Sequence, residues 1–346
     1  MAQYVKDQPA GFTNRIERVA IVGAAGNVGK PITEALLATG KHELTALTRK
    51  GSPNSLPAGV KVATIDYGDE QSIVDALKGQ QFLIISMSVT APPESHHKLV
   101  VAAAKAGVPY VMPNCYGRLI QDNDALSKET LIGESYLAGV RDIEAQGVSK
   151  WIAMSCSFWY EYSLAGGLDY YGFDFATKKA IFYDDGLVKI NTTTHLQCGR
   201  AMAALLSLKE LPENENDTDV TLSQWANKPL TIRSFLASQR DMLDSVHRVM
   251  GTTDADWTIE HESAVERYQN GVKLMMSGAP DARRGFGRAL YSRPFFPNAG
   301  FRWDVGLANQ DLGLPEEDLD EATKRAVDMA LNEEYIKKRA LYGKKE

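Results

Sequence analysis

The chain has 346 residues, which is enough for a large buried core in one α/β domain or in two smaller lobes. Its formal net charge is -6, from 38 Lys and Arg residues against 44 Asp and Glu residues, which argues against nucleic acid or an anionic membrane as the main partner. The 3 cysteines form no C-x-x-C pair, and the sequence has neither an apolar leader nor a run of about 18 apolar residues. We therefore expect a cytoplasmic protein with reduced thiols that binds a small molecule and no membrane.

The first half of the chain alternates between strand-like and helix-like segments. Nearly continuous apolar runs predict strands at 18–23, 43–49, 60–66, 81–89, 109–114 and 150–156. Amphipathic periodicity predicts helices at 28–39, 69–78, 95–106 and 128–146. Apolar strands separated by helices are typical of a parallel sheet that is covered on both faces. We therefore predict the α/β class, with a Rossmann-type doubly wound parallel sheet in residues 1–157, of which 1–16 form an N-terminal extension.

Beyond residue 157 the alternation ends and the loops lengthen. The acidic segment 212–219 has the composition of a solvated surface loop, and helical periodicity returns at 234–250 and 263–276. A last helix is predicted from Pro315, because acidic residues come first and basic residues last, in the order that complements the helix dipole. We expect residues 158–346 to form a smaller C-terminal α/β substrate lobe, either separate from the first domain or sharing its core.

Three glycines at a spacing of three join the first predicted strand to the first predicted helix, in the sequence GAAGNVG. Gly23 permits a tight turn, Gly26 lets the backbone approach a pyrophosphate at the helix N-terminus, and Gly29 lets the helix pack closely on the strand. This combination of strand, glycines and helix predicts a dinucleotide-binding turn. The residues of the turn that we expect to contact the cofactor are Gly23, Ala25, Gly26, Asn27, Val28 and Gly29.

The end of the second predicted strand distinguishes NADP from NAD. An NAD-binding protein commonly has Asp or Glu there, whereas this chain has Arg49 and Lys50, whose positive charges suit the 2′-phosphate of NADP(H). An arginine at a strand end is alternatively a solvated surface residue. Later strand ends supply the other predicted cofactor contacts, which are Asp66, Tyr67, Ser86, Met87, Ser88, Pro113 and Asn114.

Several segments together resemble one protein family. GAAGNVG with Arg49, the helix end IEAQG, and the segments SFWYEY and TTTHLQCGRAMAALL are similar to those of NmrA-like, isoflavone-reductase-like atypical short-chain dehydrogenases. The resemblance covers roughly residues 17–210 and is strongest at the glycine turn. It implies an NADP-binding Rossmann domain with a smaller substrate lobe, and reduction of aromatic or polyketide-like molecules of secondary metabolism. The family also contains proteins that bind the nucleotide and regulate others without turnover.

The catalytic lysine that this resemblance implies is absent. Its expected position, 11 residues before Gly147, holds Tyr136. Tyr136 shares a helix face with apolar residues at 132, 140 and 143, so it points inward, either as a proton donor or as a core residue with a satisfied hydroxyl. Position 140 is Val140 and not the lysine of a Tyr-x-x-x-Lys pair, so no neighbour in sequence lowers the phenol pKa. Tyr136 is therefore expected to donate a proton more readily than to accept one.

Other candidate donors are Tyr116, which follows the fifth strand, and Lys128, which stands before Tyr136 on the same predicted helix. A lysine at a helix start is also commonly solvated. His195 reads as a helix-cap residue more than a catalytic one. The adjacent His96 and His97 do not face one site on a helix, and without a third ligand nearby we expect no metal site.

The segment 158–175 is dense in aromatic residues and is broken by two glycines. Such a segment fits the wall of a pocket for a flat apolar ligand, because rigid rings provide contact area at low entropy cost. It equally fits a satellite aromatic core beneath a long loop. Phe158, Trp159 and Tyr160 lie directly beyond the sixth strand, so they are the predicted substrate contacts.

Three functions remain open at this point. The first is an NADPH-dependent reductase of an aromatic or polyketide-like small molecule, which the cofactor turn and the aromatic segment favour. The second is a non-catalytic NADP-sensing regulator, which the missing lysine favours. The third is a redox-silent isomerase, cyclase or dehydratase on the same fold. The sequence does not predict an oligomeric state.

Overall fold

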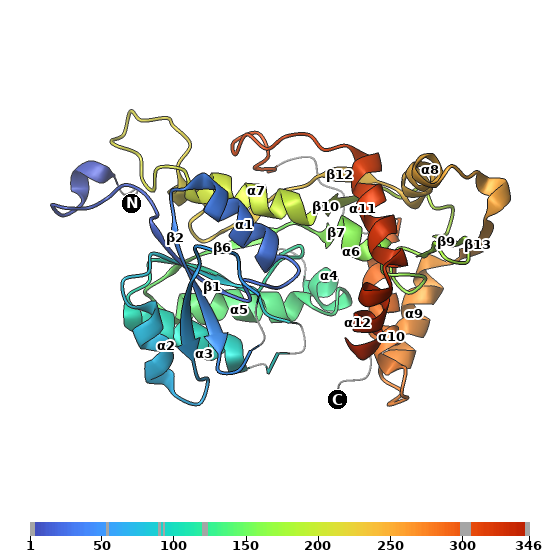
Figure 1. Cartoon of the computed structure of the whole chain (residues 1–346), viewed down its shortest axis with the longest axis horizontal. Coiled ribbons are helices and arrows are strands. Elements are labelled where there is room, and N and C mark those ends of the chain that lie inside the picture. The colour runs from blue at the N-terminus through green and yellow to red at the C-terminus, as the bar shows by residue number, and fades with distance from the viewer. Residues whose placement is uncertain are drawn as a thin grey trace.

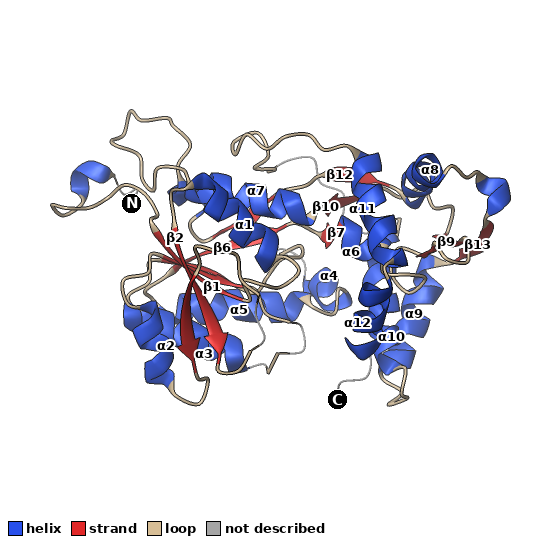
Figure 2. Ribbon diagram, viewed as in Figure 1, coloured by secondary structure: helices blue, strands red, loops and turns tan. Residues whose placement is uncertain are grey.

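The computed structural model describes residues 4–52, 55–88, 91–92, 94–119, 124–297 and 306–342. The chain forms a sheet domain, at left in Figure 1, and a lobe of helices and short strands, at right. Figure 2 shows that the long strands gather in the first part and most of the C-terminal helices in the second. No helix in these described ranges combines the length and apolar character that crossing a bilayer requires.

A seven-stranded sheet is the centre of the first part, and all of its strand pairs are parallel. Its strands, in spatial order, are β11 (Lys228–Thr231), β6 (Lys150–Ser155), β5 (Tyr110–Met112), β4 (Phe82–Ile85), β1 (Arg18–Val22), β2 (Glu43–Arg49) and β3 (Lys61–Ile65). The strand order reverses between β1 and β4, and open α/β sheets bind ligands at the carboxyl ends of the strands next to such a reversal. The predicted Rossmann-type α/β class is thereby confirmed.

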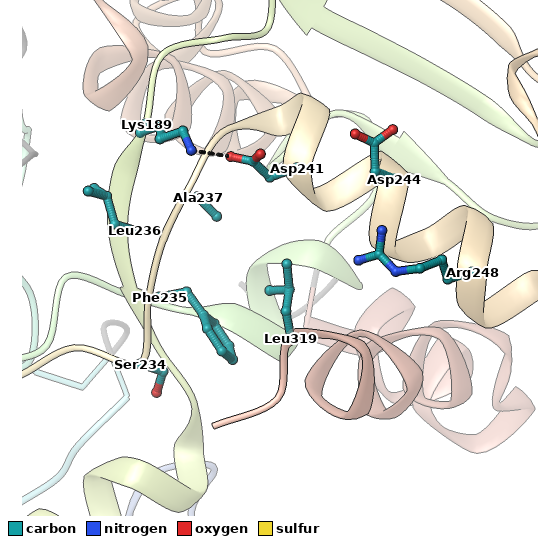
Figure 3. A pocket seen from close by; sticks show the side chains of 9 residues that line it. All are labelled: Lys189, Ser234, Phe235, Leu236, Ala237, Asp241, Asp244, Arg248 and Leu319. Carbon is teal, nitrogen blue, oxygen red and sulfur yellow. Dashed lines mark ion pairs between the residues drawn. The ribbon is translucent and has the colours of Figure 1, made fainter. Parts of the chain in front are cut away.

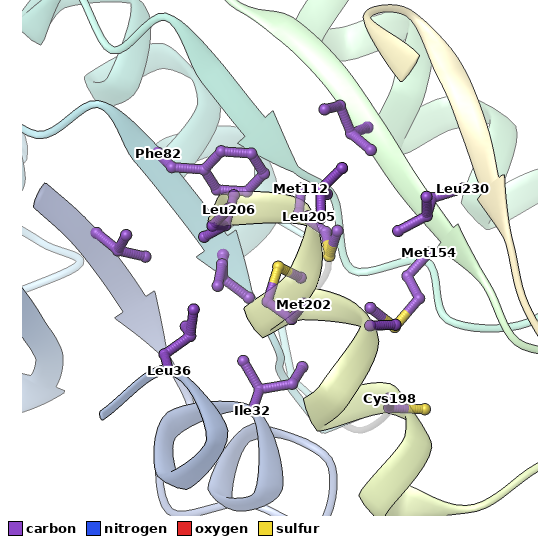
Figure 4. Close-up of a cluster of buried hydrophobic side chains, with 14 of the residues drawn as sticks. Ile32, Leu36, Phe82, Met112, Met154, Cys198, Met202, Leu205, Leu206 and Leu230 are labelled. Atoms are coloured by element: carbon purple, nitrogen blue, oxygen red, sulfur yellow. The ribbon is translucent and has the colours of Figure 1, made fainter. Parts of the chain in front are cut away.

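Helices cover both faces of this sheet, because successive side chains of a buried strand point to opposite sides. One face packs against α1 (Gly29–Thr39) and α7 (His195–Leu206), and Figure 4 shows Ile32 and Leu36 of α1 meeting Met202 and Leu205 of α7. The other face packs against α2 (Glu70–Leu77), α3 (Glu94–Ala106) and α5 (Gly133–Gln146). Burial of both faces explains why the inner strands read as continuous apolar runs, whereas the edge strand β3 is largely exposed.

The second part has its own core, built largely from aromatic side chains. Its strands are β7 (Phe158–Trp159), β10 (Ile190–Thr193) and β12 (Phe235–Ala237) in one sheet, and β8 (Phe173–Asp174), β9 (Lys179–Tyr183) and β13 (Thr258–Glu262) in another. Its helices are α6 (Tyr160–Leu164), α8 (Gln239–Met250), α9 (Ala264–Met275), α10 (Ala282–Ser292), α11 (Leu319–Leu331) and α12 (Glu333–Tyr342). The remaining elements are α4 (Asp124–Glu129) and the 3-10 turns Val5–Asp7, Leu222–Trp225, Asp254–Asp256 and Arg293–Phe295.

The two parts interleave along the chain more than the boundary at residue 157 predicts. Helix α7 and strand β11 both follow that boundary, yet α7 packs on α1 and β11 extends the large sheet beside β6. The chain therefore leaves the first core after β6, returns for α7 to β11, leaves again, and returns once more at Ala308 and Leu312. The N-terminal extension packs on the acidic loop, where the Val5 N–H donates to the Pro212 carbonyl at 3.0 Å.

Three predicted helices differ from the structure. The segment predicted as one helix at 128–146 is two, α4 and α5, because Leu131 adopts a left-handed φ of 63° between them. The helix predicted at 234–250 begins as strand β12, and α8 starts only after Ser238, which caps it in a capping box with Asp241. The last predicted helix is divided into α11 and α12 at Asn332. The last residue of the strand predicted at 81–89, Val89, lies outside the described residues.

Candidate active site

The turn between β1 and α1 requires glycine at two positions for steric reasons. Gly23 has a φ of 79°, and a Cβ there would lie 1.8 Å from the carbonyl oxygen of Ser86 at the end of β4. A Cβ on Gly29 would lie 2.1 Å from the carbonyl oxygen of Gly23. These two glycines let the turn, the start of α1 and the end of β4 lie against one another. This is the close approach that the sequence predicts for them.

Gly26 is different, because its space opens toward solvent. A Cβ on Gly26 would meet the Gly23 carbonyl oxygen at 3.1 Å and no other described atom within 4 Å. Ala25, Gly26 and Asn27 are exposed, whereas the Val28 side chain is buried in the core, so Val28 offers a ligand only its backbone. Val28 makes no side-chain capping bond at the start of α1. An exposed turn followed by an uncapped helix N-terminus suits the pyrophosphate of a dinucleotide.

The predicted residues after β2 and β3 lie beside this turn. Arg49 and Lys50 are exposed at the end of β2, which pairs with β1 and β3. Burial raises the pKa of Tyr67, and the nearby positive charge of Arg49 opposes that shift. The Tyr67 hydroxyl also lies 3.9 Å from Met87 Sδ. Asp66 uses its carboxylate locally, because it accepts the Gly68 N–H at 2.7 Å.

The loops after β4 and β5 are joined by side-chain hydrogen bonds. Asn114 Oδ1 accepts from the Met87 N–H at 2.9 Å, and Asn114 Nδ2 donates to the Met87 carbonyl at 3.2 Å. The Tyr116 hydroxyl donates to the Ile85 carbonyl at 3.1 Å. Pro113 is buried and Ser88 is exposed. The structure thus places the predicted cofactor residues along one edge of the sheet, from β3 to β5.

A cavity of about 210 Å³ opens next to this edge. Its lining comes from the loop after β5, from the start of α5 and the residues before it, from β7 and α6 with the loops beside them, and from α10. The lining residues are Tyr116, Gly117, Arg118, Thr130, Ile132, Tyr136, Ser157, Phe158, Trp159, Tyr162, Tyr170, Arg283, Phe286, Gly287, Leu290 and Tyr291. The structure therefore brings together two predicted proton donors, Tyr116 and Tyr136, and two predicted substrate contacts, Phe158 and Trp159. Because the Tyr116 hydroxyl also reaches β4, the cavity and the cofactor edge are adjacent.

The hydroxyl end of the Tyr136 ring lies close to Gly117. A Cβ on Gly117 would be 2.8 Å from Cε2 and 3.1 Å from the hydroxyl oxygen of Tyr136. Burial raises the pKa of the Tyr136 phenol, as it does for Tyr116. Both phenols therefore stay protonated at neutral pH, so each can donate a hydrogen bond or a proton but is a poor base.

Two of the predicted residues do not reach the cavity. Lys128 is exposed on α4 and lies on a different helix from Tyr136, contrary to the prediction of one continuous helix. Tyr160 is fully buried in the second core, where its hydroxyl bonds Thr323 Oγ1 at 2.7 Å. The neighbouring residues at 158 and 159 pair with β10, and the chain turns into α6 at Tyr160, which directs this ring away from the cavity.

One wall of the cavity was not predicted, because it comes from α10 more than 100 residues later in the chain. Phe286, Leu290 and Tyr291 face the cavity from this helix, and their spacing of four and five residues puts them on one side of it. Tyr291 stacks on Tyr170 with ring centroids 4.3 Å apart and an interplanar angle of 11°. The apolar spacing within ARRGFGRALYS was the available signal, but nothing in the sequence tied it to the aromatic segment.

The loop that carries Tyr170 is fixed to α9 and α10 by arginines. Asp169 accepts from Arg284 Nε at 2.7 Å and from Arg288 Nε at 2.6 Å. Burial opposes the charge on Asp169, but the two arginines outweigh it and hold the pKa of Asp169 below its usual range. Arg267, which is 3% exposed, donates to the Leu168 carbonyl. The part of the aromatic segment that lines the cavity is therefore tied to α10 by ion pairs, whereas Tyr160, Tyr171, Phe173 and Phe175 are buried in the second core.

His195 starts α7 behind this wall, as the cap reading of the sequence predicts. Thr194 is the N-cap, and the His195 ring lies 5.4 Å from the ring of Trp159. Burial lowers the pKa of His195 to about 4. The imidazole is therefore neutral at physiological pH. His96 and His97 both lie near Asp142, and no group of three possible metal ligands occurs in the described part of the chain.

A second hollow, of about 410 Å³, lies on the other lobe between β12 and the start of α8 (Figure 3). Each charged side chain in its lining has an ion-pair partner in the lining or beside it. Lys189 pairs with Asp241 at 3.2 Å, and Arg248 pairs with Asp320 at 2.7 Å. This hollow is open, and it is separate from every predicted site residue. The aromatic cavity is therefore the better candidate active site.

Comparisons with known proteins agree with this description. Residues 16–134 match the model of the NmrA-like family. Oxidoreductase aprR of Aspergillus flavus is 25% identical over 311 residues, covering 88% of this chain and 96% of that protein. A crystal structure of isoflavone reductase superposes with a TM-score of 0.70 at 20% identity, covering 90% of this chain and 99% of that one. A structure described as AtPrR2 with NADP+ and (+)pinoresinol has a TM-score of 0.65 at 18% identity, with 90% and 99% covered.

The family-model match lies within the nucleotide-binding half, whereas the matches to aprR and to isoflavone reductase extend over most of the chain. Residues 16–134 are therefore similar to the NmrA-like family, and the fold of most of the chain is that of isoflavone reductase.

Proposed function

We propose that the chain is an NADP(H)-dependent oxidoreductase that reduces a flat, largely apolar small molecule in the aromatic cavity. The oxidoreductase class and the cofactor accord with the relative named as an oxidoreductase and with the structural neighbour that holds NADP+. The observation that carries the substrate part is the position of the cavity. It adjoins the carboxyl edge of β4 and β5, next to the glycine turn, and eight of its described lining residues are aromatic.

The residues of the cofactor edge fit NADP(H). Gly26 and the uncapped start of α1 would receive the pyrophosphate, and Arg49 with Lys50 would pair with the 2′-phosphate. Bound NADPH supplies a hydride to the substrate. The loops after β4 and β5 face the cavity side of this edge, and the aromatic walls exclude water from it.

We assign proton donation to Tyr136. Its hydroxyl lies at Gly117 in the lining of the cavity, and its raised pKa keeps the proton on the phenol at neutral pH. Tyr116 is placed less favourably, because its hydroxyl already donates to the Ile85 carbonyl. Tyr116 therefore orients the β4 and β5 loops relative to each other.

One observation favours the alternative of an NADP-binding regulator without turnover. The position of the family lysine holds Tyr136, whose pKa burial raises and which has no described lysine beside it in the cavity lining. Such a site binds the nucleotide yet transfers protons slowly. The two functions differ in whether NADPH is consumed.

The test follows the absorbance of NADPH at 340 nm with a panel of aromatic ketones, enones and quinones. We expect consumption with at least one of them, and a fall in kcat of about 100-fold in Tyr136→Phe, since general acid catalysis contributes this much or more. Tyr268→Phe, at a partly exposed tyrosine of α9 outside the cavity, is the matched control and should leave kcat unchanged. NADPH binding without consumption of NADPH by any panel member would favour the regulator instead.

A further inference from the structure

Ser157 has a backbone conformation that serine rarely adopts. It lies between β6 and β7 in the cavity lining, with a left-handed φ of 59°. Bonds on both sides impose this conformation. The preceding residue, Cys156, donates its N–H to the Tyr116 carbonyl at 3.2 Å, and the carbonyl of the following Phe158 accepts from Thr192 Oγ1 at 2.8 Å. Non-glycine residues held in this region cluster at functional sites, because the strain persists only where the surroundings impose it.

The fold itself makes no use of the Ser157 hydroxyl. The residue is 8% exposed, and its Oγ is buried without a hydrogen-bond partner among the described residues. A glycine would adopt the same φ at lower cost, so the backbone does not explain the choice of serine. A buried hydroxyl that makes no hydrogen bond costs free energy. The hydroxyl is therefore available to an oxygen atom that enters the cavity.

The same wall contains a second unused donor. Trp159, two residues further along, lines the cavity, and its Nε1–H is also buried without a partner in the described chain. The charged side chains among the described lining residues are Arg118 and Arg283, and none is a carboxylate. A guanidinium has five N–H donors, so it can serve a ligand oxygen alongside a protein partner. The polar groups of the cavity thus suit oxygen acceptors and not amines.

We propose that Ser157 Oγ–H donates a hydrogen bond to the carbonyl oxygen of the substrate, which makes the substrate an aromatic ketone or quinone. This inference rests on the proposed function. In the reduction, the carbonyl carbon gains the hydride that NADPH gives up on becoming NADP+, and the π electron pair of the C=O bond moves onto oxygen. That oxygen then takes the Tyr136 hydroxyl proton, which solvent replaces, so a ketone becomes an alcohol. A quinone becomes a hydroxyenone in the same step, and this product tautomerises to the hydroquinone. Ser157 holds the oxygen while it carries charge, and Trp159 borders it on the same wall.

Two variants separate the hydroxyl from the backbone. Ser157→Ala and Ser157→Gly both lack Oγ, but only glycine relieves the left-handed strain. The probes are matched pairs that differ in the carbonyl, namely 9-fluorenone with fluorene and 1,4-naphthoquinone with naphthalene. Their affinity is measured by calorimetry with saturating NADP+, under which no reduction occurs. We expect the wild type to prefer at least one carbonyl compound to its partner about tenfold, and both variants to lose that preference.

Three outcomes would overturn the inference. These are equal affinity of the wild type for both members of every pair, no binding of either carbonyl probe, or a preference that Ser157→Gly retains. Lys178→Gly is the control for strain relief, because Lys178 has a φ of 49° in a turn outside the cavity lining. It should leave the preference unchanged. The proposed function is tested separately, by NADPH consumption. If the proposed function is wrong, the wild type consumes no NADPH, whether or not it prefers the carbonyl probes.

Discussion

The cofactor edge and the aromatic cavity adjoin each other, but they are built in different ways. The cofactor edge rests on the backbone of one continuous segment, the turn from Gly23 to Gly29, and on the ends of consecutive strands. The cavity is assembled from side chains of four separate segments, the last of them on α10. A site made of backbone depends on a few glycines, whereas a site made of distant side chains depends on the contacts that bring its walls together. Substitutions in the two regions should therefore fail in different ways.

The largest effect is expected at Gly29. In Gly29→Ala the new Cβ would lie 2.1 Å from a backbone oxygen, and backbone atoms cannot move aside cheaply, so we expect a loss of about 3 kcal/mol or more in the free energy of unfolding. Gly26→Ala is the matched control, because its Cβ meets one oxygen at 3.1 Å. It should fold normally but bind NADPH at least tenfold more weakly. Urea denaturation and NADPH titration measure both, and equal stability loss in the two variants would contradict the account.

His195 gives the next largest effect, through pH. The unfolded chain binds a proton at this histidine below about pH 6.5, whereas burial lowers the folded pKa to about 4. Between these values the unfolded state holds more protons, so folding stability falls as the pH drops from 6.5 to 4. The full loss is on the order of 3 kcal/mol.

Urea midpoints at pH 7 and pH 4.5 measure this loss. His195→Asn should reduce the difference between the two midpoints, while His97→Asn, at a largely exposed histidine, should not. If His195→Asn lost as much stability as the wild type on acidification, burial of His195 would not be the source of the effect.

The Asp169→Asn variant tests whether the ion pairs of Asp169 hold the cavity wall in place. Asp169→Asn keeps the shape of the side chain but removes the charge that accepts from Arg284 and Arg288. We expect a destabilisation of about 2 kcal/mol and a rise in KM, because Tyr170 is no longer held against Tyr291. Asp281→Asn is the control, since Asp281 makes no side-chain capping bond at the start of α10. An unchanged KM in Asp169→Asn would show that the ion pairs of Asp169 do not contribute to substrate binding.

The smallest effect is expected at Arg49. Arg49→Gln removes the charge proposed to pair with the 2′-phosphate, so the affinity for NADPH should fall about tenfold while that for NADH stays the same. Lys41→Gln, at an exposed lysine after α1, is the control. Equal weakening of NADPH and NADH binding by Arg49→Gln would show that Arg49 acts on the fold and not on the phosphate.

The contrast between the two regions also decides what the sequence could predict. Strands β1, β2 and β3 match their predicted ranges to within a residue at each end, because each is a short apolar run beside a turn. The role of each glycine in the turn follows from local spacing alone. In the second lobe, the strands of two to five residues carry too little periodicity to be recognised.

The differences between the predicted and the observed elements have particular physical causes. The break at Leu131 is followed by Gly133, the first residue of α5, where a Cβ would lie 2.4 Å from the Ser127 carbonyl oxygen. A single glycine within a helical pattern does not by itself predict a break. The capping box of Ser238 and Asp241 marks the start of α8 in the sequence, but the prediction placed the start of this helix at residue 234. The α10 wall of the cavity depends on the tertiary fold, which brings residues near 170 and 290 together. Ser157 was not among the predicted site residues, since its unusual φ and its unpartnered hydroxyl are visible only in three dimensions.

The central claim is that the substrate occupies the aromatic cavity while the cofactor lies on the adjoining edge. Gly287 on α10 lines the cavity, and a Cβ there would already approach Tyr170 Cε1 to 3.1 Å, so Gly287→Leu fills the space without touching the cofactor edge. Steady-state NADPH consumption should fall at least 100-fold in this variant, while the Kd for NADPH stays within twofold of the wild type. Unchanged turnover in Gly287→Leu would contradict the account, because the substrate would then have to bind elsewhere.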